Sequence, residues 1–364
     1  MHRTLLHILG LLILLTTASQ TANAQLGCGT PAQPKQETDA RENKILQLKL
    51  KLATANIAQF NGVVRYIPIR AHVLRRTNGT GGVTLANLNA ALAQVNAYYL
   101  SSELQFYFCA SQPNYIDNST FFEFDNSEES ALCDPNAVNN AINVYFPNSI
   151  SFGSMAVSGY AYFPSQYNAY NRVFVQAPSL TDNRTLAHEL GHYFNLYHTF
   201  QGSTDANATE LVTRSTGSNC VSKGDRLCDT PADPYGQPNV TVSGCNYTGT
   251  ATDANGATYA PSLINIMSYF YGCGNTFTGG QLSRMIDGHQ LRTDPTNDYT
   301  LSCPPTVLAA PNNFVSTISM GGVILSFDDL SNETGYIVER STVSDTSGFV
   351  PIAEIGRASC RERV

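Results

Sequence analysis

The string H-E-L-G-H-Y-F-N-L-Y-H, from His188 to His198, constrains this chain more than any other feature of its sequence. On a helix, His188 and His192 are one turn apart and share a face, so both imidazoles can reach one cation. His198 lies too far along the chain to remain on that face if the helix continued. The chain must therefore turn sharply near Asn195. Asparagine is the non-glycine residue that best tolerates the left-handed conformation such a turn needs.

The residue types in this string suit a catalytic metal site. Three imidazoles, from His188, His192 and His198, would leave a fourth position open, whereas a structural zinc site fills all four. Glu189 follows the first histidine and would lie close enough to a metal-bound water to take its proton. A bare H-E-x-x-H also occurs by chance, with its histidines simply exposed on a helix. The third histidine, preceded by a residue suited to a turn, favours the metal site.

The first 24 residues have the features of a secretion signal. A short basic start precedes the apolar run Thr4–Thr16, and Ala22-Asn23-Ala24 provides the small residues of a cleavage site. The apolar run is shorter than the roughly 20 residues that a permanent membrane-spanning helix needs. We therefore expect a secreted protein that keeps no integral membrane segment after signal removal.

The last ten residues, IGRASCRERV at 355–364, differ in amino-acid composition from the rest of the chain. They combine four charged residues with Cys360, and we interpret them as translated sequencing-adapter sequence. Cys360 is therefore left out of the cysteine argument, and we expect the natural chain to continue beyond this point.

The charge and composition of the chain argue against nucleic acid as a binding partner. The chain has a formal net charge of −7 and only 13% charged residues, against about 25% in typical globular proteins. An acidic chain of this kind is not suited to binding nucleic acid. Apart from Cys360, eight cysteines remain, and in an exported chain they indicate a disulfide framework whose pairing cannot be deduced from sequence alone.

Patterns along the middle of the chain predict an α/β fold. Apolar residues alternate over Ile67–Val73, where Pro68 indicates an edge strand or a strand start. Thr84 is expected to cap a helix whose apolar residues recur at helical spacing. Further strands and one more helix are predicted at Leu104–Phe108, Ile142–Phe146, Tyr160–Phe163, Arg172–Val175 and Gly280–His289. Strands interleaved with helices in this way indicate a sheet covered by helices.

Changes in polarity and in predicted secondary structure along the sequence also divide the chain into parts. Residues 25–60 are polar and then helical, and we expect them to form a leader outside the main core. Residues 61–303 would be the main domain, with a long ordered loop region at Gly202–Tyr259. In 304–354, a linker precedes predicted strands at Val323–Phe327 and Tyr336–Glu339. This part resembles the start of a fibronectin type III domain, an incomplete β-sandwich, with Phe327 where that family usually has tryptophan.

The histidine string resembles the extended zinc motif of the metzincins, H-E-x-x-H-x-x-G-x-x-H. Its continuation, Leu196-Tyr197-His198-Thr199-Phe200, is most similar to the pappalysin family and its cytophagalysin-like members, with Asn195 in place of the usual glycine. The resemblance spans Val63–Cys303. It implies an α/β (α+β) zincin fold with a mixed twisted sheet, an active-site helix, an irregular lower subdomain and a horizontal cleft.

Downstream, Asn265-Ile266-Met267-Ser268-Tyr269 resembles the family's Met-turn. Without the histidine string, Met267 would be interpreted as an ordinary core methionine. The resemblance implies that Met267 forms a hydrophobic floor under the zinc histidines. It also implies that Tyr269 approaches the metal and steadies the tetrahedral intermediate.

The segment Gly224–Asp233 resembles a calcium-binding loop of the same family, with Asp225, Thr230 and Asp233 at the ligand positions. Hard oxygen ligands at close spacing suit Ca²⁺. The alternative is a solvated acidic turn, because Asp and Pro favour turns in any case.

The family's pattern also implies a disulfide between Cys245 and Cys273. The simplest remaining pairs are then Cys220–Cys228 and Cys109–Cys133, which leaves Cys28 and Cys303. Cys28, in the leader, could bind zinc as a thiolate and keep a precursor inactive, as family leaders can. It could equally be the disulfide partner of Cys303. We favour the switch.

Taken together, the resemblance implies a secreted, monomeric, zinc-dependent endopeptidase that is made as a zymogen and acts on protein or peptide substrates. One alternative is an adhesion or glycan-binding protein with a non-catalytic zinc scaffold; another is a zinc amidase for non-peptide substrates. The presence of Glu189 and Tyr269 disfavours an inactive scaffold. Ser268–Thr278, which lines the family's main pocket, has no acidic residue, so cleavage beside basic side chains is not expected.

Overall fold

The structure is a computed structural model, and it describes residues 27–31, 34–54, 63–182, 184–205, 209–270, 272–304, 311–319, 322–328, 335–344, 349–356 and 362–363. The predicted signal peptide and Cys360 lie outside these residues. Among the described helices, none is both long and apolar enough to cross a membrane.

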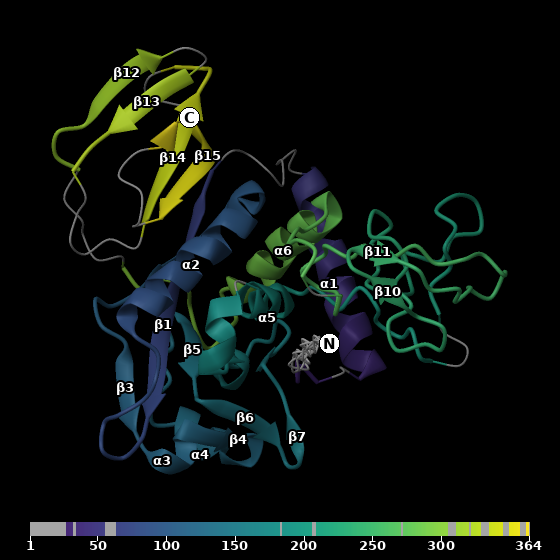
Figure 1. Cartoon of the computed structure of the whole chain (residues 1–364), viewed down its shortest axis with the longest axis horizontal. Coiled ribbons are helices and arrows are strands. Elements are labelled where there is room, and N and C mark those ends of the chain that lie inside the picture. The colour runs from purple at the N-terminus through teal and green to yellow at the C-terminus, as the bar shows by residue number, and fades with distance from the viewer. Residues whose placement is uncertain are drawn as a thin grey trace, which may run out of the picture.

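A mixed sheet forms the centre of the main domain (Figure 1). Its strand order is β2-β1-β5-β9-β8, with β3 also paired to β1. β8 runs antiparallel to β9, and the other pairs are parallel. The strand bounds are β1 Arg65–Arg75, β2 Leu104–Phe108, β3 Asn114–Asp117, β5 Ile142–Phe146, β8 Gly159–Ala161 and β9 Arg172–Val175.

Alternation along the central strands divides the core into two clusters. On β5, Val144 belongs to a cluster with helices α2 (Leu85–Tyr99) and α5 (Thr185–Tyr193), whereas Tyr145 belongs to a second cluster. The second cluster includes residues from short elements that follow β3: α3 Ser119–Phe122, β4 Glu123–Asp125, α4 Glu129–Cys133 and β6 Ser149–Phe152. The exposed strand β7 Met155–Ala156 pairs with β6. Because side chains alternate across a strand, one strand supplies both layers of the core.

Most predicted elements match the structure closely. Thr84 caps α2 by accepting the backbone N–H of Asn87, and the predicted strands at Ile142–Phe146 and Arg172–Val175 have the observed bounds of β5 and β9. Pro68 was expected at an edge or a start, but β1 lies between β2 and β5. The pairing of β1 with β5 begins only at Ile69. The missing N–H of Pro68 therefore falls before that ladder, where it costs no hydrogen bond.

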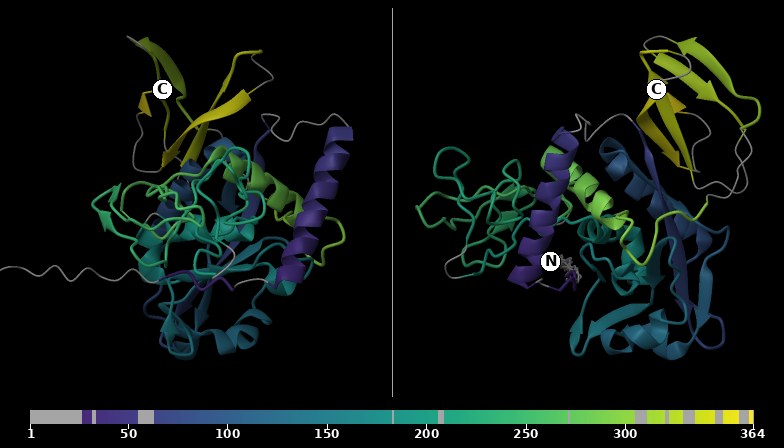
Figure 2. Two further views of the ribbon diagram at one scale, coloured as in Figure 1. Left: turned by 90° about the vertical axis from the view of Figure 1, so that its right-hand side faces the viewer. Right: turned by 180° about the vertical axis from the view of Figure 1, so that it is seen from behind.

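Helix α6 (Gly279–Arg292) packs against the backbone of Phe194, directly after the active-site helix. A Cβ built on Gly288 would lie 2.2 Å from the carbonyl oxygen of Phe194, so only glycine permits this approach. Helix α1 (Lys35–Thr54), the predicted leader helix, lies alongside α6 (Figures 1 and 2). Most of the described residues between α5 and α6 are irregular, and the named strands among them are the short pair β10 Val242–Ser243 and β11 Asn246–Tyr247.

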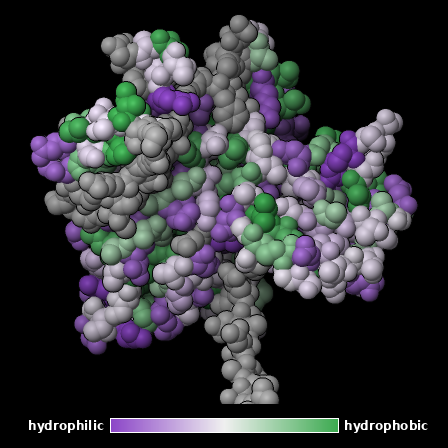
Figure 3. Space-filling view, turned by 45° about the horizontal axis from the view of Figure 1, so that its top comes forward, coloured by the Kyte–Doolittle hydropathy of each residue, from purple (hydrophilic) through white to green (hydrophobic). Residues whose placement is uncertain are grey.

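Beyond Cys303 the structure describes two β-hairpins. They consist of β12 Val315–Ser319 with β13 Gly322–Ser326, and β14 Gly335–Ser341 with β15 Phe349–Gly356, while β16 Glu362–Arg363 pairs with β13. β15 lies against α2. On the face of the molecule shown in Figure 3, polar and apolar side chains are interspersed.

Among the described residues, three disulfides are present: Cys109–Cys303, Cys220–Cys228 and Cys245–Cys273. The expected pair Cys109–Cys133 is wrong, and so is the alternative pair of Cys28 with Cys303. Cys109 follows β2 at the sheet edge, while Cys133 is buried in the second core cluster. The chain returns to Cys109 only at Cys303, whose N–H donates to Asn140. Cys28 and Cys133 are free thiols.

Candidate active site

Helix α5 presents the histidine string, and its start is held by Asp182. One carboxylate oxygen of Asp182 accepts the backbone N–H groups of Arg184 and Thr185, each at 2.8 Å. The helix ends two residues before Asn195, which has φ 76°. The N–H of Leu196 then donates to the carbonyl of Gly191 at 2.8 Å. This closes the turn that the sequence predicted at Asn195.

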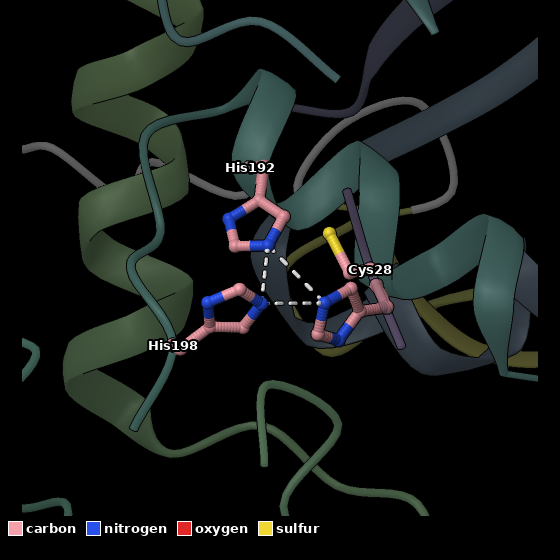
Figure 4. A group of neighbouring side chains, drawn as sticks. Cys28, His192 and His198 are labelled. Carbon is pink, nitrogen blue, oxygen red and sulfur yellow. Dashed lines mark hydrogen bonds between the residues drawn. The ribbon is translucent and has the colours of Figure 1, made fainter. Parts of the chain in front are cut away.

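The turn brings three imidazoles together (Figure 4). The Nε2 atoms of His188, His192 and His198 lie 3.0–3.2 Å from one another. Nδ1 of His188 is 2.8 Å from the carbonyl oxygen of Ile266, and Nδ1 of His192 is 2.7 Å from that of Leu196. A carbonyl can only accept, so Nδ1 carries the proton in both rings. Their Nε2 lone pairs therefore point at a common centre.

This donor set fits a zinc ion. Tetrahedral zinc with Zn–N of about 2.0–2.1 Å places its nitrogen ligands roughly 3.3 Å apart, close to the observed separations. Burial lowers the pKa of His188 and His198 well below the ordinary value, and that of His192 to about 4. Neutral imidazoles are the metal-binding form. The Nε2 lone pairs of His188 and His192 lie 3.1 Å apart and repel each other, and a cation bound between them would relieve that repulsion.

Glu189 lies beside this centre and has no exposed surface. Burial raises the pKa of its carboxyl to about 8. Its Oε2 accepts from the Thr30 hydroxyl at 3.2 Å and from the Cys28 thiol at 3.4 Å. Gly159 of β8 makes room for it, since a Cβ there would lie 2.9 Å from the Glu189 Cγ. The Glu189 carboxylate is thus held beside the metal site, whose ligands are the three histidines and not Glu189.

Met267 packs directly beneath the helix. A Cβ built on Gly191 would lie 2.6 Å from the Met267 sulfur, which explains the small residue inside H-E-L-G-H. The Met267 carbonyl accepts the N–H of Thr199 at 3.1 Å, next to the third histidine. Arg184 holds the same turn by donating to several backbone carbonyls, including those of Ile266 at 3.1 Å and Ser268 at 2.6 Å.

Tyr269 lies next to the histidines, with its ring centroid 5.1 Å from that of His198. Its hydroxyl accepts the N–H of Cys28 at 2.7 Å and donates to the carbonyl of the same residue at 3.1 Å. The hydroxyl therefore already contacts a main-chain carbonyl at the metal centre. This is the interaction that an oxyanion-binding group must make.

Residues 27–30 of the predicted leader lie at this centre in the structure. The Cys28 sulfur and one ligand nitrogen from each of the three histidines all lie within 4.8 Å of one another. Residues 27–30 run parallel to β8, with Gly29 N–H donating to the Gly159 carbonyl at 2.8 Å and Ser158 N–H donating to the Gly27 carbonyl at 2.9 Å. Burial raises the pKa of the Cys28 thiol, so its thiolate needs a neighbouring cation.

Helix α1 is held over the site mainly by charged side chains. Arg41 donates to the Asn195 side chain at 2.7 Å and to the Tyr197 hydroxyl at 3.0 Å. Glu42 forms an ion pair with Arg284, and Lys49 pairs with Asp287 at 2.9 Å. Burial opposes ionisation of Glu42, but Arg284 holds the pKa of that carboxyl below its ordinary value.

The predicted calcium ligands Asp225 and Asp233 belong to an acidic cluster in the irregular region, because the charges of both act on Glu210, but these carboxylates do not converge as tightly as Cys28 and the three histidines. Asp225 and Asp233 are buried, and Asp233 accepts from the hydroxyls of Thr199 at 2.6 Å and Ser268 at 2.8 Å. Burial raises the pKa of Asp225 to about 7. Glu210 also belongs to this acidic cluster, and burial raises its pKa to about 8 despite an ion pair with Arg214. Thr230 is buried, and its hydroxyl lies 3.4 Å from that of Thr278.

Several residues that shape the site carry no sequence signal that we could have used. Thr30, Arg41 and Arg184 act through partners 81 to 159 residues away along the chain. Glu210 lies outside Gly224–Asp233 in the sequence, so the resemblance to a calcium-binding loop did not include it. A Cβ on Gly224 would nevertheless lie within 2.0 Å of the Glu210 carboxylate. Only the fold brings these groups to the histidines or to the acidic cluster.

Comparison with known proteins agrees with this geometry. Residues 132–290 match the family model Peptidase_M43, described as pregnancy-associated plasma protein-A. The chain is 26% identical over 300 residues to an extracellular metalloprotease of Colletotrichum graminicola, covering 76% of this chain and 94% of that one. It is 27% identical over 256 residues to one of Arthroderma gypseum, covering 66% and 78%.

The fold also matches a solved structure. A promirolysin mutant from Tannerella forsythia superposes with a TM-score of 0.50 at 16% identity, covering 75% of this chain and 99% of that chain. At this identity the match concerns the fold, which is the metzincin-like α/β arrangement expected from sequence. The family model covers the histidine string, the Met267 turn and α6 up to Gln290. Residues 132–290 therefore form a pappalysin-type (Peptidase_M43) domain, and the chain is a secreted zinc metalloendopeptidase.

Proposed function

We propose that this endopeptidase is made as a latent precursor, in which Cys28 of the leader fills the fourth position of the His188–His192–His198 metal site. The observation that carries the proposal is the thiol itself: a free cysteine meets the three convergent imidazoles although it comes from a distant part of the chain. Three nitrogens and one sulfur form a closed zinc site, and a closed site leaves no position for water.

In the mature enzyme, the removal of residues 25–60 reopens that position. A bound zinc ion would supply Lewis acidity and lower the pKa of a water toward about 7. Glu189 then takes a proton from the attacking water and delivers it to the leaving amine. Its position supports this role, because its carboxylate borders the metal centre and accepts hydrogen bonds there from Cys28 and Thr30 of the leader.

Tyr269 would donate its hydroxyl hydrogen to the substrate oxygen that becomes negatively charged. In the latent form the same hydroxyl donates to the Cys28 carbonyl. Met267 would support the histidines from below through its contact at Gly191. An extended substrate would add to β8 by backbone pairing, as the leader does at Gly159.

We also propose that Asp225, Thr230 and Asp233 bind calcium together with the neighbouring Glu210 carboxylate. Three carboxylates in one buried cluster repel each other, and a hard cation with oxygen ligands would relieve that repulsion. Asp233 links this cluster to Thr199, which follows the third histidine. Calcium would thus stabilise the floor of the active site rather than take part in hydrolysis.

Latency is tested by Cys28→Ala in the full-length, zinc-loaded chain. We expect the variant with its leader still attached to cleave a short fluorogenic peptide at least about tenfold faster than the intact wild type. The fourth ligand would be missing, while β8 would remain partly covered by the leader. Gel analysis at each time point verifies that the leader is uncleaved, so that the rate belongs to the precursor.

Cys133→Ala is the matched control, because Cys133 is the other free thiol among the described cysteines and is buried in the second core cluster. It should leave latency unchanged. Equal activity of the intact Cys28→Ala and wild-type precursors would contradict the switch. In that case the leader would block the cleft by strand pairing alone.

A further inference from the structure

A group of cationic and hydroxyl side chains at one end of the cleft holds carboxylates of the leader. Arg284 Nη1 donates to the Glu42 carboxylate at 3.3 Å, and a second guanidinium nitrogen also contacts it. The Tyr197 hydroxyl donates to the same carboxylate at 3.0 Å. Arg226 approaches the neighbouring leader carboxylate of Asp39 at 3.8 Å.

These donors are positioned by the catalytic domain rather than by the leader. Arg284 Nε donates to the backbone carbonyl of Asn195 at 2.7 Å, so α6 and the zinc-site turn fix its direction. Its guanidinium lies over the Tyr197 ring, 4.7 Å from the centroid, and that of Arg226 lies 5.8 Å from the same centroid. The two arginines therefore flank the residue that precedes the third zinc ligand, and they keep these supports when the leader is absent.

The same group borders the active site. A cavity of about 380 Å³ is lined by His192, His198, Tyr197, Lys223 and Arg226. Leader residues close part of its wall, including Thr38 and Lys35. Once the leader is removed, Arg226 loses the Asp39 carboxylate beside this cavity, and Arg284 loses Glu42 but stays near Asp225 and Asp287. Asp205 is the acidic residue that also lines it, and it is exposed.

We propose that Arg284, Arg226 and Tyr197 form a carboxylate-binding subsite of the mature enzyme, which selects substrates carrying Asp or Glu a few residues from the scissile bond. Glu42 occupies this subsite in the latent form as a stand-in for the substrate carboxylate. A guanidinium fork with an adjacent hydroxyl matches the two oxygens of a carboxylate. This inference rests on the proposed removal of the leader.

The subsite lies toward the end of β8 that leads to Phe163. The Phe163 ring is 5.2 Å from that of Tyr197, and the leader passes from Thr30, which binds Ala161, to this point. A substrate paired antiparallel to β8 would place residues preceding the scissile bond there. A substrate paired parallel, like the leader, would place the residues that follow it there.

The test uses matured, zinc-loaded enzyme and a set of fluorogenic peptides. Each peptide carries Glu, Gln or Lys at one position, scanned across the four residues on either side of the scissile bond. We expect one position, or two adjacent ones on the same side, where kcat/KM for Glu exceeds that for Gln at least about fivefold, with Lys below Gln. High salt should reduce this ratio, since charge attraction is screened.

Substitutions test whether Tyr197, Arg226 and Arg284 cause the preference for Glu over Gln. Tyr197→Phe and Arg226→Gln should each lower the Glu/Gln ratio at that position toward one, and Arg284→Lys tests the guanidinium fork with its charge kept. The ratio is taken within each variant, so a general loss of activity cancels. Arg75→Gln, which removes an exposed ion pair with Asp117 at the far side of the sheet, is the matched control and should leave ratio and rate unchanged.

The outcomes separate this inference from the proposed function. If no peptide is cleaved, the endopeptidase mechanism itself fails. Cleavage of the Glu and Gln peptides at equal rates at every position overturns the subsite while leaving the mechanism intact. A Glu preference that survives both Tyr197→Phe and Arg226→Gln also overturns it, because the carboxylate would then bind elsewhere.

Discussion

At the residue scale, the active site depends on which atoms can carry protons. Carbonyls fix the protons of His188 and His192 on Nδ1, so their Nε2 atoms are left for a cation. The H-E-x-x-H string predicted the helix face but not these carbonyls, which come from Ile266 and Leu196. Such partners of metal-bound histidines set ring orientation and basicity.

Tyr269→Phe tests the oxyanion role at this scale. The variant loses one donor to the developing negative charge but keeps the ring beside His198. We expect kcat of the matured enzyme to fall about 10- to 100-fold, at or below the loss seen when other enzymes lose one such donor. KM should change little, since a hydroxyl that acts in the transition state adds little to ground-state binding. An unchanged kcat would remove Tyr269 from the mechanism.

At the element scale, local periodicity predicted most of the helices and strands. The bounds of β5 and β9 follow from short apolar runs, and Thr84 marks the start of α2 through its own cap. Pro68 misled the prediction. A proline has no backbone N–H to donate, but the sequence does not show whether the neighbouring strand on that side extends as far as the proline. That information is held in the β1–β5 register, which is not local.

The turn after α5 gives a prediction for this scale. Asn195 has φ 76°, in the left-handed region, where alanine costs roughly 1–2 kcal/mol more than glycine. In the matured enzyme, which lacks Arg41, we expect Asn195→Ala to lower the free energy of unfolding by about 1 kcal/mol. Asn195→Gly should be close to neutral. Denaturant titration of both variants checks this, and equal stability would show that the backbone conformation is not limiting.

At the scale of the whole molecule, contacts between distant segments were the least predictable. The Cys109–Cys303 disulfide spans 194 residues, and the sequence offered a nearer partner, Cys133. The leader likewise reaches the catalytic domain through ion pairs such as Glu42–Arg284, which no periodicity encodes. In contrast, Leu46 and Leu50 of α1 are each 53% exposed, so its helical pattern alone did not indicate where it docks.

Calcium should affect the stability of the whole catalytic domain. The pKa values of Asp225 and Glu210 are raised to about 7 and about 8 in the folded state, above their ordinary values near 4. The folded protein then binds more protons than the unfolded chain. Without calcium, the free energy of unfolding should therefore fall as pH rises from about 4 to about 8.

Calcium binding to these carboxylates would offset that loss. We expect added Ca²⁺ to raise Tm of the zinc-loaded protein more at pH 8 than at pH 5, and Mg²⁺ to do so less. Asp225→Asn should abolish most of the effect. If Ca²⁺ leaves Tm unchanged at pH 8, the cluster is a buried acidic turn and not an ion site.

The most direct test of the account compares matured wild type with Glu189→Ala, measuring zinc content and peptide hydrolysis on the same samples. The three histidines hold the metal without Glu189, so the variant should retain one zinc per chain. Its kcat/KM should fall at least about 1,000-fold, because no other described group is placed to take the proton from water. Retained zinc with lost cleavage is the predicted result. Zinc-loaded Glu189→Ala that still cleaves peptides at the wild-type rate would contradict the assignment of this site.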